Sequence, residues 1–344
     1  MRLIRYLVAS SHSGTSLSTN TFLYGNHQLT GTAWCRRSLV GLFCAILCFY
    51  SLVATAQPVA GNAISVTDYT GKPVSLSRPA ERIVALSPHL VENIFSAGAG
   101  DRLVGVVAYS DYPPVVKQIQ QIGSNNLLNF EAIVALQPDL IVGWQSGNTK
   151  HSLNRLKDLG FALYIDEPKH LQDIARSVRD IGVLAGTSAS AEAAAARFLS
   201  SLRQLQYQHR NLTPVTVFYQ VWNQPLQTIN DQHVISAAIK LCGGQNIYAD
   251  QAIIAPVVNI ESIIDRDPQV IIASGVSEQR PDWLDDWLRW PQLTAVKNKH
   301  LFFVPANHLQ RHTLRMLSGV AAICEQLQQV RQHALANEKS GQTD

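Results

Sequence analysis

Short apolar runs alternate with longer amphipathic segments from residue 82 onward, and this pattern predicts an α/β fold. The runs are rich in Val, Ile and Leu, as in strands buried on both faces of a sheet. Predicted strands cover residues 82–88, 103–108, 140–144, 161–165, 215–220, 270–273 and 301–304. Predicted helices cover residues 90–97, 149–159, 170–185, 232–242, 281–289 and a terminal stretch to about 333. Strands alternating with helices at this pitch indicate doubly wound parallel sheets.

A single long helix is predicted between two such series. Residues 188–207 are rich in Ala and contain no Gly or Pro, so their helix propensity is high throughout. We therefore expect two doubly wound α/β lobes joined by one long rigid helix, with a ligand cleft between the lobes. A helical connection limits how far such lobes open and close. The predicted boundaries are 57–186 for the N-terminal lobe, 187–212 for the linking helix, 213–338 for the C-terminal lobe and 339–344 for a tail.

Two segments on either side of this helix repeat the same pattern. Asn129–Val142 and Asn259–Ile272 align without a gap, each with Glu two residues after the Asn and Pro seven residues after the Glu. Asn is a good N-cap, and Glu131 or Glu261 in the first turn suits the helix dipole. The two glutamates are therefore either helix stabilisers or a pair of groups that the two lobes present to one partner.

The N-terminal segment has the composition of an export signal. Residues 1–56 contain four Arg and no Asp, Glu or Lys. The pair Arg36–Arg37 precedes an apolar run over 39–53, and Ala54-Thr55-Ala56 supplies a small-residue cleavage pattern. We expect an N-terminal extension followed by a cleavable signal peptide, and hence a periplasmic protein; an uncleaved N-terminal anchor is the alternative.

Removing this leader changes the charge and the cysteine count. The chain has 28 basic and 25 acidic residues; without the four leader arginines the two signs nearly balance, so no nucleic-acid partner is expected. Three of the five cysteines leave with the leader, and Cys242 and Cys324 remain. An even count in an oxidising compartment favours a disulfide between them, with two buried free thiols as the alternative.

Catalytic motifs are missing from the sequence. It contains no Gly-x-Ser-x-Gly elbow, phosphate-binding Gly loop or His-Glu-x-x-His motif, so we do not expect an enzyme, and a secreted hydrolase is a distant alternative. His308 and His312 are four residues apart, but without supporting carboxylates or cysteines this spacing is more typical of a surface pair. We therefore predict no metal site and no cofactor.

Aromatic residues follow several of the predicted strands. They are Tyr109 and Tyr112, Trp144, Tyr219 and Trp222. In open α/β sheets, ligands bind outside the carboxyl ends of the strands. Two lobes that each offer rings there would enclose a large, partly apolar ligand, unless the rings only cover the core of their own lobe.

The longer motifs resemble the periplasmic substrate-binding proteins of ABC importers for cobalamin, siderophores and haem, and most closely the cobalamin-binding members. The resemblance covers residues 60–335 and rests on Arg82–Pro88, Tyr109–Pro114, the two repeated segments and Leu241–Tyr248. It implies two lobes bridged by one long helix, a disulfide between Cys242 and Cys324, and docking of Glu131 and Glu261 onto arginines of the permease. It also implies a monomer that delivers a corrinoid to an inner-membrane permease–ATPase complex.

The ligand site implied by the resemblance is only partly present. Tyr109, Trp144 and Arg311 match ligand-contacting positions of the family, whereas Asn307 stands where the family has an acidic residue. Trp222 and His89 are further candidates for ligand contact. Three family aromatics are replaced, by Asn125, Gln227 and Ala255. The expected ligand is cobalamin or a related cobamide, with a ferric siderophore or haem as the alternative.

Overall fold

The computed structural model describes residues 64–275 and 278–340. The predicted extension and signal peptide (1–56) and the last four residues of the predicted tail lie outside the described residues. All described residues belong to one compact unit, Ala60–Asp344. No helix in this described part is both long and apolar enough to cross a membrane.

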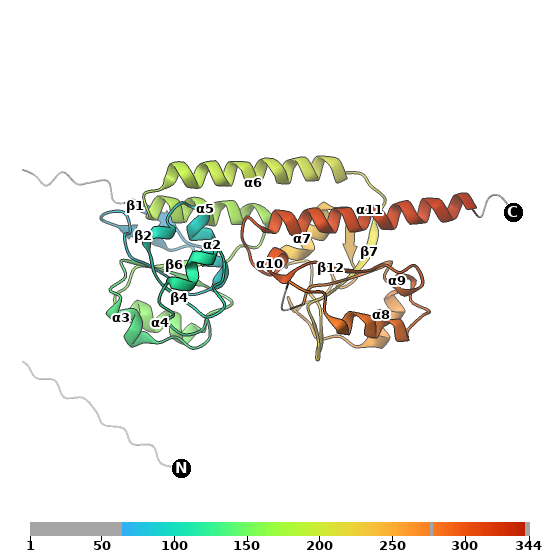
Figure 1. The fold of residues 1–344 in the computed structure, drawn as a ribbon, viewed down its shortest axis with the longest axis horizontal. Helices are drawn as coiled ribbons and strands as arrows, with labels where there is room; N and C mark the ends of the chain where they lie inside the picture. Colours follow the sequence, from blue (N-terminus) through green and yellow to red (C-terminus); the bar gives the residue numbers. More distant parts are fainter. Residues whose placement is uncertain (1–63, 276–277, 341–344) are drawn as a thin grey trace, which may run out of the picture. The chain divides into compact units, whose positions relative to one another are not determined.

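The N-terminal lobe is built on a four-stranded parallel sheet (Figure 1). Its strands, in spatial order, are β4 (Leu103–Val106), β3 (Ile83–Ala85), β5 (Leu140–Trp144) and β6 (Leu163–Asp166). Its helical segments are α2 (Pro88–Ser96), η2 (Gly100–Arg102), η3 (Pro114–Gln118), α3 (Phe130–Ala135), α4 (Lys150–Asp158) and α5 (Leu171–Leu184). An antiparallel hairpin precedes the sheet, formed by β1 (Ile64–Thr67) and β2 (Pro73–Leu76).

The C-terminal lobe repeats this arrangement. Its parallel strands, in spatial order, are β10 (Gly244–Asn246), β7 (Val215–Gln220), β11 (Val270–Ala273) and β12 (Leu301–Phe303). Its helical segments are α7 (Val234–Leu241), α8 (Ile260–Arg266), η4 (Asp282–Arg289), α9 (Thr294–Lys297), α10 (Ala306–Leu309) and α11 (Met316–Ser340). A short hairpin of β8 (Trp222–Asn223) and β9 (Leu226–Gln227) follows β7. In each sheet the strand that comes first in the chain (β3 or β7) lies between the next two strands of that sheet (β4 and β5, or β10 and β11). The strand order therefore reverses at the same place in both lobes.

The two lobes share helices rather than a flexible linker. The long helix α6 (Ser188–His209) packs along α5 and α11 (Figure 1). Side chains from α5 and α6 enter two different hydrophobic cores. Those in the N-terminal core are Val178, Ile181, Leu184, Ala191 and Ala194. Those in the C-terminal core are Leu171, Ile174, Ala175, Ala195, Phe198 and Leu202. The prediction of one long connecting helix is therefore confirmed, and α5 adds a second shared element.

Two of the predicted helices differ in the structure. The predicted helix 281–289 is the 3₁₀-helix η4, which starts after Pro281 and buries Leu284 and Trp287. These two side chains are three residues apart, so a helix with three residues per turn keeps both on the same side. The terminal helix α11 ends at Ser340 rather than near 333, because the sequence beyond 333 continues with good helix formers as far as Gly341.

Cys242 and Cys324 form a disulfide that ties α7 to α11. Both residues are buried in the C-terminal core. This confirms the disulfide and excludes the alternative of two free thiols.

Replacing both cysteines by alanine is expected to lower the free energy of unfolding by about 4 kcal/mol. The reason is that the disulfide closes a loop of 82 residues and restricts the unfolded chain. Urea denaturation of the wild type, the double variant and the reduced wild type measures this. If reduction leaves the wild-type midpoint unchanged, the disulfide does not stabilise the fold.

Candidate ligand-binding site

The carboxyl ends of the central strands provide the framework of the site. In the N-terminal sheet the strand order reverses between β3 and β5, and in the C-terminal sheet between β7 and β11. Ligands of open α/β sheets bind at such points. His89 lies in the first turn of α2, just after β3, and Trp144 is the last residue of β5. The fold therefore brings these two predicted residues together.

Three histidines and a tryptophan meet where the lobes face each other. The ring of His89 lies 5.0 Å from that of Trp144 and 5.6 Å from that of His312. His312 is also 6.1 Å from Trp144 and 6.1 Å from His233, measured between ring centroids. His89 and Trp144 come from the N-terminal lobe, whereas His233 and His312 come from the C-terminal lobe.

Beside this ring cluster is a cavity of about 570 Å³ that both lobes line. Trp144, Glu167 and His170 contribute from the N-terminal lobe, and His233, Ile254, Ala255 and His312 contribute from the C-terminal lobe. Ser146, Lys169, Asp231 and Gln232 line it as well, so the cavity combines a ring and aliphatic groups with many polar ones. Such a lining suits an organic ligand that has both apolar and polar groups. The predicted cleft is therefore present, with an aromatic wall.

A backbone hydrogen bond determines the tautomer of neutral His233. It is the N-cap of α7, and its Nδ1 accepts a hydrogen bond from the backbone N–H of Ile235 at 3.1 Å. Because Nδ1 is an acceptor, the proton of the neutral ring is on Nε2. Burial lowers the pKa of His233 to about 4. At neutral pH this side chain is an uncharged donor on the wall of the cavity.

The other two histidines are deeply buried. Burial lowers the pKa of His312 well below its usual range, and the nearby His89 and His233 add to the effect. The Nδ1 of His312 is buried without a hydrogen-bond partner. His89 is held by Ser87, whose Oγ lies 2.8 Å from Nδ1, and its Nε2 is 3.4 Å from a carboxylate oxygen of Asp166. The expectation that His308 and His312 form a surface pair is wrong, because α10 ends at Leu309 and the chain then turns His312 inward.

Arg311 joins the two lobes through ion pairs. Its guanidinium lies 2.9 Å from Glu92 and 2.6 Å from Asp111, and it donates to the backbone carbonyl of Tyr109 at 3.1 Å. Arg315 adds a second contact to the buried Glu92 at 3.4 Å. Arg311 therefore lies at the junction of the lobes, where its predicted ligand contact would compete with Asp111.

The remaining predicted ligand residues lie outside the cavity wall. Tyr109 is 84% exposed, and its backbone has a φ of 65°. Trp222, in β8, is 37% exposed, and its indole N–H donates to the carbonyl of Gln224. The side-chain amide of Asn307 donates to the carboxylate of Glu278. Their roles as ligand contacts stay predictions.

Two of the replaced aromatic positions contact each other. The side-chain amide of Gln227 donates to the backbone carbonyl of Ala255 at 3.1 Å. This bond holds the segment that carries Ile254 and Ala255 at the cavity. Asn125 similarly donates to the carbonyl of Gly147, close to Trp144. Polar side chains at positions 125 and 227 thus support the backbone around the cavity.

The repeated glutamates lie where their pattern predicts. The side chain of Asn129 caps α3 by accepting from the N–H of Ala132, and that of Asn259 caps α8 by accepting from the N–H of Ser262. Glu131 and Glu261 are in the first turns and are exposed. Neither glutamate has an ion pair within the described residues. Both carboxylates are therefore free to bind a cation from another molecule.

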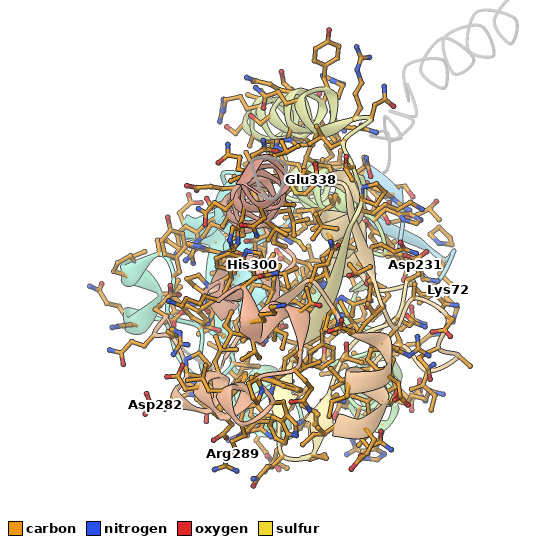
Figure 2. The ribbon with its side chains drawn as sticks, turned by 90° about the vertical axis from the view of Figure 1, so that its right-hand side faces the viewer. Lys72, Asp231, Asp282, Arg289, His300 and Glu338 are labelled. Carbon is orange, nitrogen blue, oxygen red and sulfur yellow. A yellow bond between two sulfur atoms is a disulfide. The ribbon has the colours of Figure 1, made fainter. Side chains whose placement is uncertain are left out.

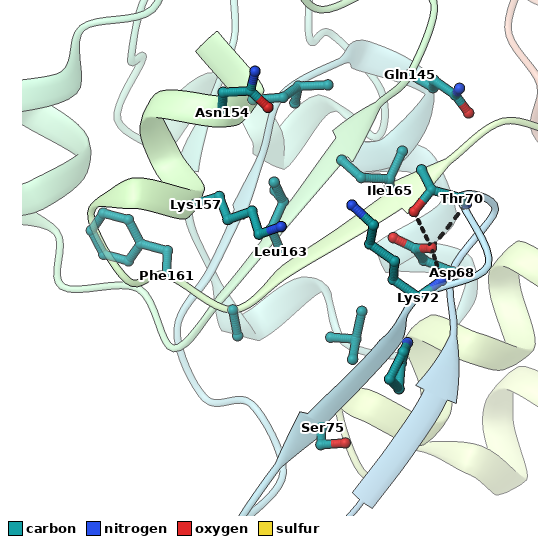
Figure 3. A pocket seen from close by; sticks show the side chains of 14 residues that line it. Asp68, Thr70, Lys72, Ser75, Gln145, Asn154, Lys157, Phe161, Leu163 and Ile165 are labelled. Carbon is teal, nitrogen blue, oxygen red and sulfur yellow. Dashed lines mark hydrogen bonds between the residues drawn. The ribbon is translucent and has the colours of Figure 1, made fainter. Parts of the chain in front are cut away.

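A second cavity, of about 400 Å³, lies within the N-terminal lobe alone (Figure 3). Lys72 and Lys157 reach toward it across Leu163 and Ile165. The nearby Asp68 carboxylate accepts from Thr70 and from the backbone of Lys72, so it is used by its own turn. None of the predicted ligand residues lines this cavity, and we place the candidate site between the lobes.

Within residues 64–275 and 278–340, no cluster of three or more His, Cys, Asp or Glu could hold a metal ion.

The sequence reasoning missed His233 and His312. His233 directly precedes a strongly apolar helix, and this position alone would have marked it as a possible N-cap. Nothing in the sequence places His312 beside His89, because the contact is between lobes and depends on tertiary packing. Two lobes with facing strand ends and a shared aromatic cavity define a two-lobed ligand-binding protein.

Comparison with known proteins gives the family. A family model described as periplasmic binding protein matches residues 83–308. The vitamin B12-binding protein of Vibrio cholerae is 36% identical over 250 residues, which cover 72% of this chain and 90% of that protein. That of Yersinia pestis is 34% identical over 251 residues, which cover 73% and 88%. The chain belongs to the periplasmic binding protein family.

Solved structures agree with this assignment. The crystal structure of the periplasmic vitamin B12-binding protein of Vibrio cholerae matches with a TM-score of 0.69 at 35% identity, covering 74% of this chain and 98% of that one. A periplasmic haem-binding protein of the same organism shares the fold, with a TM-score of 0.63 at 20% identity and coverage of 72% and 98%. The predicted architecture of two α/β lobes and one long connecting helix is thereby confirmed.

The stability of the fold is expected to decrease as the pH falls from about 6.5 toward 4. In this range His233 takes up a proton when the chain unfolds but stays neutral when folded, so its contribution is complete above pH 6.5. Lowering the pH from 7 to 5 is therefore expected to reduce the free energy of unfolding by about 2 kcal/mol through His233. Urea denaturation at both pH values should show a smaller loss for His233→Asn, which keeps an N-cap side chain but does not titrate. Equal losses would contradict the assignment.

Proposed function

We propose that this protein is a periplasmic receptor that binds a corrinoid between its lobes and delivers it to an inner-membrane ABC importer. The observation that carries the proposal is the cavity that both lobes line, with Trp144 on one side and His233 and His312 on the other. A corrin is a broad macrocycle with apolar faces and a rim of polar amides. Aromatic side chains favour such faces, and fixed donors favour the carbonyl groups of the rim.

The relatives support the same ligand class, because those from Vibrio cholerae and Yersinia pestis are named vitamin B12-binding proteins. Export through a cleaved signal peptide and function as a monomer belong to the same proposal. Trp144 would pack on the ligand, and the Nε2–H of His233 would donate to its rim. Tyr109, Arg311, Trp222 and Asn307 would make further contacts by movement of their own side chains, and His89 would support Trp144 from behind.

A second candidate ligand is haem. The observation in its favour is the group of three histidines around the cavity, since imidazole nitrogen is a common axial ligand of haem iron. The replacement of family rings at Asn125 and Ala255 also allows a ligand other than cobalamin.

Ligand identity is tested by thermal unfolding with cyanocobalamin and, separately, with haemin. A corrinoid receptor is expected to gain about 4 kcal/mol of stability when the corrinoid is present at 1,000 times its dissociation constant. Trp144→Ala should weaken corrinoid binding by about 10- to 100-fold, because a large buried contact is lost. Trp222→Ala, outside the cavity wall, should have a smaller effect. If haemin raises the melting temperature and cyanocobalamin does not, the ligand is haem and the corrinoid proposal is wrong.

Docking is tested by reversing both free glutamates. The double variant Glu131→Arg, Glu261→Arg is expected to abolish uptake while its ligand affinity stays at the wild-type value, because the reversed charges repel basic residues of the permease. Asp265→Arg is the matched control, since Asp265 is an exposed acidic residue of α8 four positions after Glu261. Uptake that survives the double reversal would show that these glutamates are not the docking contacts.

A further inference from the structure

A pocket rich in tryptophan adjoins Glu261. It has a volume of about 420 Å³ and lies between α8, η4 and the β8–β9 hairpin. Trp283, Trp287 and Trp290 line it together with Leu226, Val258 and Glu261. None of the residues around the inter-lobe cavity belongs to it, so it is a separate feature of the C-terminal lobe.

The pocket is preformed by the core beneath it. Trp287 is buried, and its indole N–H donates to the side-chain oxygen of Gln220 at 2.7 Å. Its ring lies 5.6 Å from that of Trp290, and Trp283 and Trp290 pack partly against the same core. The indoles are therefore held in place, while those of Trp283 and Trp290 remain partly accessible.

The charge at this pocket is unbalanced. Asp286 and Arg289 both line it and lie 3.6 Å apart, so their charges largely cancel. The Arg289 side chain extends outward from the end of η4 (Figure 2) and is 73% exposed. Glu261 has no partner among the described residues, so the pocket keeps one uncompensated negative charge.

We propose that this pocket receives an arginine side chain of the permease, with its guanidinium on Glu261 and against the accessible indole faces of Trp283 and Trp290. The inference rests on the proposed docking function and names the surface that recognises the cation. Arginine fits each part of the pocket. Its planar guanidinium pairs with a carboxylate and stacks on an aromatic ring, and its methylene groups pack against aliphatic side chains such as Leu226 and Val258. Lysine, a strongly hydrated point charge, gains less from the rings.

The test measures binding of the ligand-loaded receptor to its permease–ATPase complex reconstituted in lipid nanodiscs. Trp283→Ala is expected to weaken this binding about tenfold, the size of a partly desolvated cation–aromatic contact, whereas Trp283→Phe, which keeps a ring, should stay within about threefold of wild type. Leu288→Ala is the matched control. Leu288 is on the same 3₁₀-helix and is 58% exposed, but it does not line the pocket. The Leu288→Ala receptor should bind the permease–ATPase complex like wild type.

A second variant keeps the test valid if Trp283→Ala does not fold. Val258→Trp fills the pocket from a partly exposed position and should also weaken binding about tenfold or more, with unchanged ligand affinity. Wild-type binding by Val258→Trp, or by a folded Trp283→Ala, overturns the inference. The Glu131→Arg, Glu261→Arg receptor in the same assay separates the two proposals. If it binds normally, the docking function fails; if it does not bind while the pocket variants do, only the pocket assignment fails.

Discussion

The site depends on hydrophobic packing that the two lobes share. Helices α5 and α6 each place side chains in both cores, so neither lobe can rotate far without exposing apolar surface. The change from one core to the other falls within α5 between Ala175 and Val178, and within α6 between Ala194 and Ala195. Burial of such side chains contributes about 1.5–3 kcal/mol for each large one. The two sheets therefore face each other in a nearly fixed relation, which holds the walls of the cavity between their strand ends in place.

A smaller polar contact limits movement at the site itself. Glu92 is buried and meets both Arg311 and Arg315, and the side-chain amide of the neighbouring Asn93 donates to the backbone carbonyl of His312. Separating the lobes here would leave a charge without partners, which costs several kcal/mol in a poorly hydrated environment. The hydrogen bond from Asn93 holds the backbone of His312, so that its ring stays beside the ring of His89. Packing keeps the lobes together, and the ion pairs determine which groups face the ligand.

The sequence predicted most of the fold because its signals are local. Apolar runs marked every strand of the two parallel sheets except β10, whose sequence Gly244-Gln245-Asn246 has no apolar run, and the Ala-rich segment marked α6. The N-caps Asn129 and Asn259 and the first-turn glutamates were predicted for the same reason, since helix capping involves only neighbouring residues. The site was less predictable. His312 faces the cavity because α10 ends at Leu309, and Arg311 is engaged by Glu92, more than 200 positions earlier in the chain. Such pairings follow from how the lobes pack, and no short pattern encodes them.

The ligand cavity and the proposed docking surface are subject to different physical demands. A ligand cavity can include polar groups if each of them finds a partner, as Gln227 does with the carbonyl of Ala255. A carboxylate proposed to dock must instead stay free, and Glu131 and Glu261 lie in capped first turns without an ion pair within the described residues. In the proposed function, the cavity would determine what is carried, whereas the glutamates and the tryptophans near Glu261 would determine where it is delivered. The proposed ligand contacts and the proposed docking contacts therefore involve separate residues, so a substitution in the cavity would leave the docking surface unchanged.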